Sequence, residues 1–420
     1  MTLTLVPPAP VLPTPVRPDP LGVLGVPGEI NLDHAASAPC ARAAADAVAE
    51  LLPWYASVHR GAGALSRRCT LAYERARQSV ADFVGARPDD HVIFTRNTTD
   101  AVNLLARALP AGTTVVTFGG EHHANLLPWP RGSVRLPVPD SPAGAVRSLA
   151  AALGELARDA RPGLPVLVAV TGASNVTGEC WPVADLARVA HRHGARILVD
   201  AAQLAPHAPV DLTASDVDYL ALSGHKLYAP FGAGVLVGRA DWLDAAPPYL
   251  AGGGATSHVG AATHEVRWAT GPARHEAGTP NLLGAVALGA VCEALAAADR
   301  SALHAREQAL LARLRSGLAA LPDVVELRAF GPEAPRVGIV SFVVAGRDSA
   351  EVAAHLATRH RIGVRDGLFC AHPLTRRLLS EAAARSGRTD LPPTALRASL
   401  GLGTTAQEVD TLLTALATLP

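Results

Sequence analysis

Short apolar runs alternate with longer segments of helical spacing between residues 91 and 237, and this alternation restricts the chain to few folds. Each run has four or five residues bounded by Gly, Pro, Asp or Asn, and the runs lie at 91–94, 114–118, 166–170, 196–199 and 234–237. Alanine- and arginine-rich segments of helical length, such as 145–160 and 183–193, separate several of them. Since parallel strands need crossover connections, usually helical, the pattern predicts an α/β fold with a mostly parallel sheet covered by helices on both faces.

The pattern changes on either side of this region. Helical periodicity appears earlier, at 40–52 and 71–84. After about residue 298 we predict a different succession: helix 301–321, strand 337–344, helix 349–358, strand and loop 362–373, and helix 406–416. About 120 residues are enough for a separate domain. We therefore expect a proline-rich arm (1–29) that packs with the small domain, a large domain (30–298) and a small α+β domain (299–420).

Composition favours a small-molecule ligand. Lys+Arg and Asp+Glu both number 37 and the pI is about 7.3, so charge gives no reason to expect a nucleic acid or a membrane partner. The five cysteines are scattered without a CxxC pair, which argues against a disulfide framework and against a metal site. The sequence has no candidate transmembrane span, and its first 28 residues lack the pattern of a signal peptide. We predict a soluble, cytoplasmic protein.

Lysine occurs once in the 420 residues, as Lys226. Arginine can replace lysine where only charge is needed, but it cannot form a Schiff base with an aldehyde. An arginine-rich composition explains why lysine is scarce, but not why the remaining one follows Ser223 and His225 and precedes the run 230–237. That run is typical of a turn leading into a buried strand. We interpret Lys226 as an amine kept for chemistry.

Ligands of parallel α/β sheets bind beyond the carboxyl ends of the strands, so the residues after each apolar run are informative. Thr98 and Thr99 open a helix after the first run, which suits a phosphate, although an ordinary helix cap is an equal alternative. His122 follows the second run, where an imidazole could stack on a planar ring and shuttle a proton as a catalytic residue, or simply be one of two surface histidines. Asn175 follows the third run, and Asp200 ends the fourth.

These groups form a consistent set. A buried carboxylate such as Asp200 needs a cationic or donor partner, which a protonated pyridine nitrogen would provide. The other groups are an amine that could bind an aldehyde, an imidazole that could stack on a ring face, an amide that could bind a phenolic oxygen, and hydroxyls that could bind a phosphate. Pyridoxal 5′-phosphate requires these groups, so we predict it as the cofactor.

At this point the chain resembles the class V, fold-type I pyridoxal-phosphate enzymes, and within them the SufS-like cysteine desulfurases and selenocysteine lyases. The resemblance rests on the segments 31–36, 58–61, 121–125, 199–203, 223–228, 276–281 and 397–400. The most specific are Ser223-Gly224-His225-Lys226-Leu227-Tyr228 and Glu276-Ala277-Gly278-Thr279-Pro280-Asn281. It implies a large domain with a mostly parallel seven-stranded sheet flanked by helices, and a smaller α+β C-terminal domain.

The resemblance also implies a role for each site residue. Lys226 would form the Schiff base, Asp200 would pair with the pyridine nitrogen and His122 would stack on the ring. Asn175 and Gln203 would face the phenolic oxygen. The phosphate would be held by Thr98, Thr99, Ser223 and His225. Thr279 would reach the phosphate of a partner subunit, which implies a homodimer. Arg397 would bind the substrate α-carboxylate, and Arg365 and Asn175 would assist at the substrate.

By the same resemblance, Cys370 is the nucleophile that takes sulfur from L-cysteine and becomes a persulfide, leaving alanine, before a possible protein acceptor receives the sulfur. Here the chain departs from the family pattern, because Asp366, Leu368 and Phe369 stand where hydroxyl and polar residues are usual. An acid and an apolar wall both disfavour a thiolate, whereas His372 and Arg365 favour one.

Three alternatives remain open from the sequence. A C–S lyase acting on a cysteine conjugate or sulfoxide by β-elimination would use the same lysine and arginine without Cys370. A class V aminotransferase or epimerase would also leave Cys370 unused. A cofactor-free interaction protein on an old enzyme scaffold is the alternative from another class, and retention of the single lysine argues against it.

Overall fold

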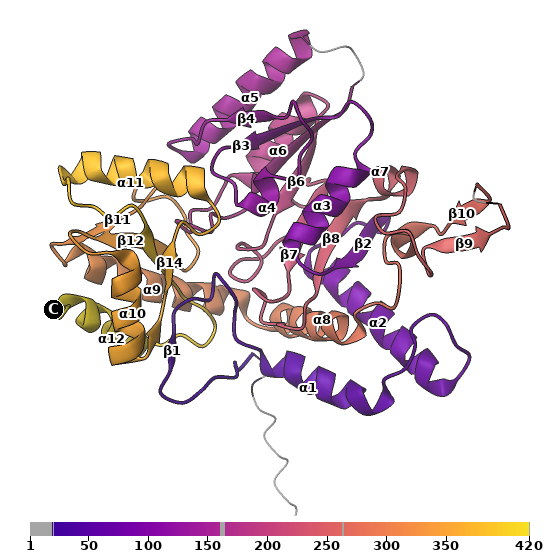
Figure 1. The fold of residues 1–420 in the computed structure, drawn as a ribbon, viewed down its shortest axis with the longest axis horizontal. Helices are drawn as coiled ribbons and strands as arrows, with labels where there is room; N and C mark the ends of the chain where they lie inside the picture. The colour runs from indigo at the N-terminus through magenta and orange to yellow at the C-terminus, as the bar shows by residue number, and fades with distance from the viewer. Residues whose placement is uncertain (1–18, 20, 160–163, 263, 420) are drawn as a thin grey trace, which may run out of the picture.

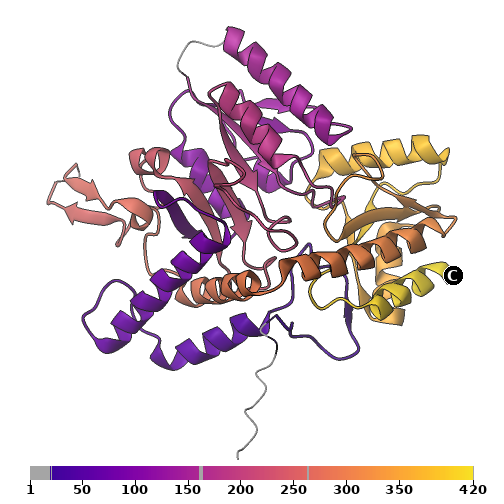
Figure 2. The ribbon, with the colours of Figure 1, turned by 180° about the vertical axis from the view of Figure 1, so that it is seen from behind.

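The computed structural model describes residues 19, 21–159, 164–262 and 264–419, and its two largest sheets, of seven and four strands, pack in separate cores (Figures 1 and 2). Most of the predicted N-terminal arm, residues 1–18 and 20, lies outside the described residues. Among the described residues of the arm, Val23 forms a β-bridge with Ala41. Directly after the arm, Ile30–Asn31 (β1) pairs in parallel with Ile362–Gly363 (β13). The chain therefore contacts its C-terminal part before it enters the large sheet.

The large sheet has seven strands in the order β2-β8-β7-β6-β5-β3-β4. Only β8 runs against the others, as its antiparallel pairing with both β2 and β7 shows. All five predicted runs are confirmed as strands. The strands are Asp90–Thr95 (β2), Thr114–Phe118 (β3), Val134–Leu136 (β4), Val166–Thr171 (β5), Arg196–Asp200 (β6), Tyr219–Ser223 (β7) and Gly234–Arg239 (β8).

Alternate residues of these strands enter two different cores, as the two-residue period of a strand requires. Val168, Ile197 and Val235 belong to the core under one group of helices: Arg42–Leu51 (α1), Ala64–Phe83 (α2), Pro142–Asp159 (α5), Val183–Arg192 (α6) and Leu282–Ala297 (α8). Leu167 and Leu198 face the other way, against Thr98–Ala108 (α3) and Ala240–Ala245 (α7). Helices thus cover both faces of the sheet, which confirms the predicted layering.

The C-terminal part carries a four-stranded sheet in the order β11-β12-β15-β14, formed by Val324–Glu326 (β11), Ile339–Val344 (β12), Ala395–Ser399 (β15) and Arg365–Gly367 (β14). Helices Arg300–Ala319 (α9), Ser349–His360 (α10) and Ala406–Ala417 (α12) share one core with it. His372–Ser386 (α11) packs in a second core with Phe369. This arrangement is the smaller α+β unit predicted after residue 298, although β11, α11 and β15 were not among the predicted elements.

Shorter elements connect these layers: Leu52–Trp54 (η1), His123–Leu126 (α4), Gly271–Arg274 (η2) and the hairpin Thr256–Val259 (β9) and Val266–Trp268 (β10), which projects from the body (Figure 1). Within the described ranges, no single helix is long and apolar enough to cross a bilayer; the pair α8 and α9 reaches that length and composition only when taken together across a sharp bend.

A buried ion-pair network attaches the 276–281 segment to the large sheet. The Glu276 carboxylate accepts hydrogen bonds from Tyr73 Oη (3.0 Å), from both terminal nitrogens of Arg77 (2.8 and 2.9 Å) and from the Phe94 N–H (2.7 Å). The side chains of Glu276 and Arg77 are 7% and 14% exposed. Removing one partner leaves a buried charge poorly compensated.

We therefore expect Glu276→Ala to lower the free energy of unfolding by about 3 kcal/mol, measured by urea titration. Glu74 also pairs with Arg77, but its side chain is 45% exposed, and Glu74→Ala should cost less than about 1 kcal/mol. Equal losses in the two variants would contradict the assignment of Glu276 as the central partner.

Candidate active site

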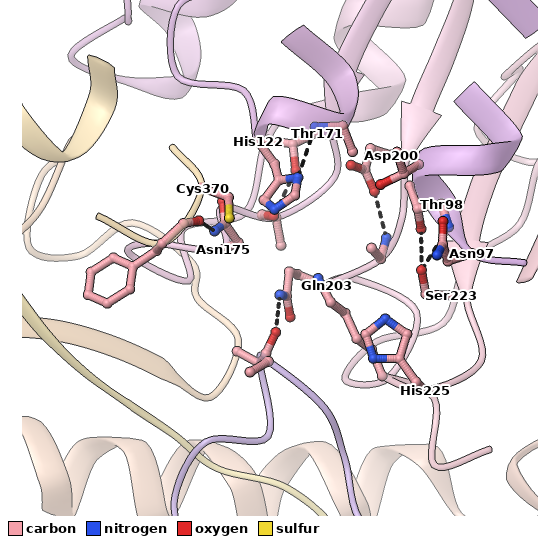
Figure 3. Close-up of a pocket in the computed structure, with 18 of the residues that line it drawn as sticks. Asn97, Thr98, His122, Thr171, Asn175, Asp200, Gln203, Ser223, His225 and Cys370 are labelled. Carbon is pink, nitrogen blue, oxygen red and sulfur yellow. Dashed lines mark hydrogen bonds between the residues drawn. The ribbon is translucent and has the colours of Figure 1, made fainter. Parts of the chain in front are cut away.

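A cavity of about 300 Å³ lies at the carboxyl ends of the central strands, and it collects nearly all the predicted site residues (Figure 3). Residues of the large sheet and its loops form most of its wall, and the C-terminal part closes it. The predicted residues that line it are Thr98, Thr99, His122, Asn175, Asp200, Gln203, Ser223, His225, Lys226, Arg365, Cys370 and Arg397. The strand ends of the large sheet and the C-terminal part thus bring together residues as far apart in the sequence as Thr98 and Arg397.

Lys226 follows β7 in the turn that leads to β8, and it lines the cavity. Burial lowers the pKa of Lys226 to about 8, although Asp200 acts in the opposite direction. A lysine is a nucleophile only when neutral, so this shift makes the amine available near neutral pH.

The single lysine permits a direct test of this pKa. In cofactor-free protein, reductive methylation with ¹³C-formaldehyde labels Lys226 and the chain terminus, and Lys226→Ala protein identifies the terminal signal. The ¹³C shift of the lysine signal should titrate at about pH 8, since the amine is protonated below that pH and neutral above it. A midpoint near the ordinary 10.5 would contradict the burial effect.

Asp200 ends β6, is 5% exposed and lines the cavity. Burial raises the pKa of Asp200. Within the described residues, its carboxylate accepts one hydrogen bond, from the Ala202 N–H at 3.0 Å. A buried carboxylate with a single neutral donor is under-satisfied, and a protonated ring nitrogen in the cavity would complete its partners.

His122 stands at the N-cap of α4, where its Nδ1 accepts the Ala124 N–H at 3.0 Å. Burial lowers the pKa of His122 to about 3, with Lys226 acting in the same direction. The imidazole is therefore neutral, and because Nδ1 is an acceptor its proton lies on Nε2. A neutral imidazole on the cavity wall is suited to stack on a planar ligand.

The amino end of α3 forms a cradle for an anion. Ser223 Oγ lies 2.8 Å from the Thr98 N–H and 2.7 Å from Thr98 Oγ1, which joins the end of β7 to the first turn of α3. Asn97 caps the helix by accepting the Asp100 N–H, and Thr99 and His225 line the same part of the cavity. Helix N–H groups and hydroxyls at this point suit a phosphate.

Asn175 and Gln203 lie on the cavity wall, but each already makes one hydrogen bond to a backbone carbonyl. Gln203 Nε2 donates to Ala35 O and Asn175 Nδ2 donates to Phe369 O, both at 2.8 Å. An amide nitrogen has two N–H groups, so each side chain retains one for a ligand.

Arg397 is 3% exposed and comes from β15 of the C-terminal sheet. Nη2 donates to Asp33 Oδ1 at 3.0 Å and Nη1 to Asn175 O at 2.9 Å. Nε is buried and has no partner among the described residues. A guanidinium fixed on two sides with a free N–H is prepared to receive a carboxylate. Arg365, on the neighbouring strand β14, is exposed and lines the same cavity.

Cys370 lies between β14 and α11 and is exposed, whereas Cys69 and Cys292 are buried and Cys40 and Cys180 are half-buried. Cys370 lines the same cavity as Lys226, and Figure 3 shows it beside His122 and Asn175. Of the residues expected to make its thiol less reactive, Phe369 contributes to the cavity wall, whereas Asp366 and Leu368 are not among the residues that line it.

Three contacts that shape the site were not predicted from the sequence. Asp33 holds Arg397, and Phe369 carries the carbonyl that Asn175 binds. Glu121, fully buried, accepts hydrogen bonds from the Asn125 amide and the Thr171 N–H, and burial raises its pKa to about 8. A carboxylate next to His122 in the sequence was the available signal for Glu121; nothing local marked the pairing of Asp33 with Arg397 or the contact of the Phe369 carbonyl with Asn175.

Thr279 does not line the cavity of its own chain, and it is exposed. In the described ranges, no group of three or more His, Cys, Asp or Glu side chains could hold a metal ion. The sequence-derived role of Thr279 at a partner's site stays a prediction.

Residues 30–412 match the family model described as aminotransferase class V. The chain belongs to this family. A cysteine desulfurase of Dickeya dadantii (strain 3937) is 38% identical over 398 residues, which cover 92% of this chain and 90% of the relative. A cysteine desulfurase of Escherichia coli O127:H6 is 35% identical over 398 residues, with 92% of each chain covered.

Solved structures of class V family relatives agree with the fold. The cysteine desulfurase CsdA of Escherichia coli, in an S-sulfonic acid form, has a TM-score of 0.77 and 32% identity, covering 93% of this chain and 94% of its own. The apo cysteine desulfurase of Thermococcus onnurineus NA1 has a TM-score of 0.79 at the same identity and coverage. The fold predicted for this chain is therefore confirmed.

Proposed function

We propose that the protein is a pyridoxal-phosphate-dependent cysteine desulfurase, which takes sulfur from L-cysteine to give alanine and a persulfide on Cys370. One observation carries this proposal: the exposed thiol of Cys370 lines the same cavity as the single lysine and the buried Arg397. A lyase, aminotransferase or epimerase would need the lysine and the arginine but no thiol in that position.

The cavity fits the cofactor. Asp200 would pair with the ring nitrogen, His122 with the ring face, and Asn175 and Gln203 with the phenolic oxygen. Thr98, Thr99, Ser223 and His225 would hold the phosphate at the start of α3, and Lys226 would hold the aldehyde carbon. When bound, pyridoxal phosphate accepts the electron pair released at the substrate α-carbon.

The chain's own residues supply the remaining steps. Arg397 binds the substrate carboxylate and thereby orients the amino acid in the cavity. The neutral amine of Lys226 removes the α-proton and later returns a proton to carbon. The Cys370 thiolate attacks the substrate sulfur, so an S–S bond forms as the C–S bond breaks. The β-carbon is reduced while the two sulfurs are oxidised to the persulfide level, and alanine leaves.

A homodimer is part of this proposal. Thr279 is exposed and lies outside the cavity of its own chain, which supports a role at a second copy. Large apolar side chains are also exposed on and around η1 and α2, namely Leu52, Trp54, Tyr55, Leu65 and Leu71. Exposed apolar groups of this kind favour burial against another chain. We further propose that the enzyme is cytoplasmic, because its five cysteines are unpaired, as is usual in a reducing compartment. There it would pass its sulfur to a protein acceptor.

Product analysis tests the proposal. Incubated with L-cysteine and a reductant, the enzyme should yield alanine and sulfide in equal amounts, quantified by amino-acid analysis and a colorimetric sulfide assay. A β-elimination enzyme would instead release pyruvate and ammonia. Pyruvate in place of alanine would therefore reject the desulfurase and leave the C–S lyase.

A further inference from the structure

We propose that Asn175 positions Cys370, in addition to the contact expected of it at the cofactor. This inference rests on the proposed function, because the position of the thiol matters only if Cys370 receives sulfur.

The cysteine segment has an unfavourable backbone conformation. Phe369 and Cys370 both have φ of 53°, in the left-handed region that residues with a Cβ avoid. A bulky residue there is a true outlier, and two in succession persist only when surrounding contacts enforce them. Gly367, at φ 109°, is the only glycine of the turn. Without external support, the segment would relax to another conformation and carry the thiol with it.

Two hydrogen bonds from the large domain hold the segment. Asn175 Nδ2 donates to Phe369 O at 2.8 Å, and this contact is buried. The His123 N–H donates to Cys370 O, also at 2.8 Å. These bonds fix the carbonyl groups of the two peptide units that flank the Cys370 α-carbon. Of the two donors, only the Asn175 amide is a side chain, so it is the one that substitution can remove.

Asn175 is itself held by the substrate-binding side of the cavity. Arg397 Nη1 donates to the backbone carbonyl of Asn175, and the guanidinium lies over the Phe369 ring at 5.2 Å from its centroid. The second N–H of the Asn175 amide remains for the cavity. One side chain therefore connects the ligand space, the carboxylate-binding arginine and the cysteine segment.

Gln203 provides a matched comparison. It carries the same amide group, lines the same cavity and is expected at the same phenolic oxygen. Its backbone contact is to Ala35 O, far in the sequence from Cys370. Changes that arise from the cofactor should therefore appear in variants of both residues, whereas changes in the cysteine segment should appear only in Asn175 variants.

Amide hydrogen exchange of the purified holoenzyme, followed by mass spectrometry, tests the positioning directly. The informative peptides cover 121–126, where the His123 N–H is bonded to Cys370 O, and 367–375, where the Ala371 N–H is bonded to Leu368 O. Asn175→Asp keeps the shape but replaces the donor by an acceptor, and Asn175→Ala removes it. We expect exchange in both peptides to be about tenfold faster in these variants. Gln203→Ala should leave both peptides at wild-type rates.

A second measurement separates positioning from general damage. Exchange of the α-proton of L-alanine with deuterated solvent needs Lys226 but not the thiol. Asn175→Asp should lower desulfuration of L-cysteine about tenfold more than α-proton exchange, whereas Gln203→Ala should lower both equally. Unchanged exchange of both peptides in the Asn175 variants, or equal acceleration in Gln203→Ala, would overturn the proposal. Because hydrogen exchange needs no turnover, its result is independent of whether the products identify a desulfurase.

Discussion

Replacing Lys226 by alanine will abolish turnover of L-cysteine, with a loss on the order of 10⁴-fold or more, the scale observed when a group essential to covalent catalysis is removed. Lys226 lies where the strand ends meet, beside Asp200, and no other lysine exists in the chain to replace it. The variant should also lose the visible absorbance that a protein-bound Schiff base gives, because arginine side chains cannot form one.

Lys226→Arg is the matched control for charge. It keeps a cation near Asp200 but has no primary amine, so it should be as inactive as the alanine variant. Sulfide production at a rate near that of the parent in either variant would eliminate Lys226 as the reactive amine, and with it the cofactor assignment.

Cys370→Ala should lower desulfuration by about 10³-fold, within the range for removal of a catalytic nucleophile, while α-proton exchange of L-alanine continues near the parent rate. The reason is chemical: the exposed thiol lines the cavity, but it is not among the groups expected to hold the cofactor or to bind the substrate carboxylate. Sulfide, alanine and pyruvate should all be quantified.

Cys40→Ala is the corresponding control. Cys40 is a half-buried thiol outside the cavity, and its replacement should leave sulfide production intact. Undiminished alanine and sulfide from Cys370→Ala would remove the persulfide step, and pyruvate from the parent enzyme would transfer the assignment to a lyase.

The sequence predicted the strands of the large sheet well where apolar residues were continuous. It did not mark β4, which has only three residues, or β7, Tyr219–Ser223, which runs directly into the polar turn that carries Lys226. Helix α8 was also missed. Its buried residues include Leu282, Leu288 and Leu295. The helix carries apolar side chains around its whole circumference, so it lacks the polar face that produces a helical period in the sequence.

Most of the site could be predicted because parallel strands end at one edge, so residues after separate strands had to converge. Contacts between the two sheets could not be predicted in this way. The pairing of Asp33 with Arg397 and of Asn175 with Phe369 O joins residues 364 and 194 positions apart, and it depends on how the C-terminal part packs against the large sheet. No local pattern encodes that packing.

The distribution of thiols has a practical consequence. Four of the five cysteines are buried or half-buried in the folded chain, and only Cys370 is exposed. A gentle alkylating dye applied to native protein should therefore react first with a single sulfur, and the amount bound should count the competent catalytic centres in a preparation. The same accessibility leaves this sulfur open to peroxide, so storage under air should inactivate the enzyme through one defined lesion.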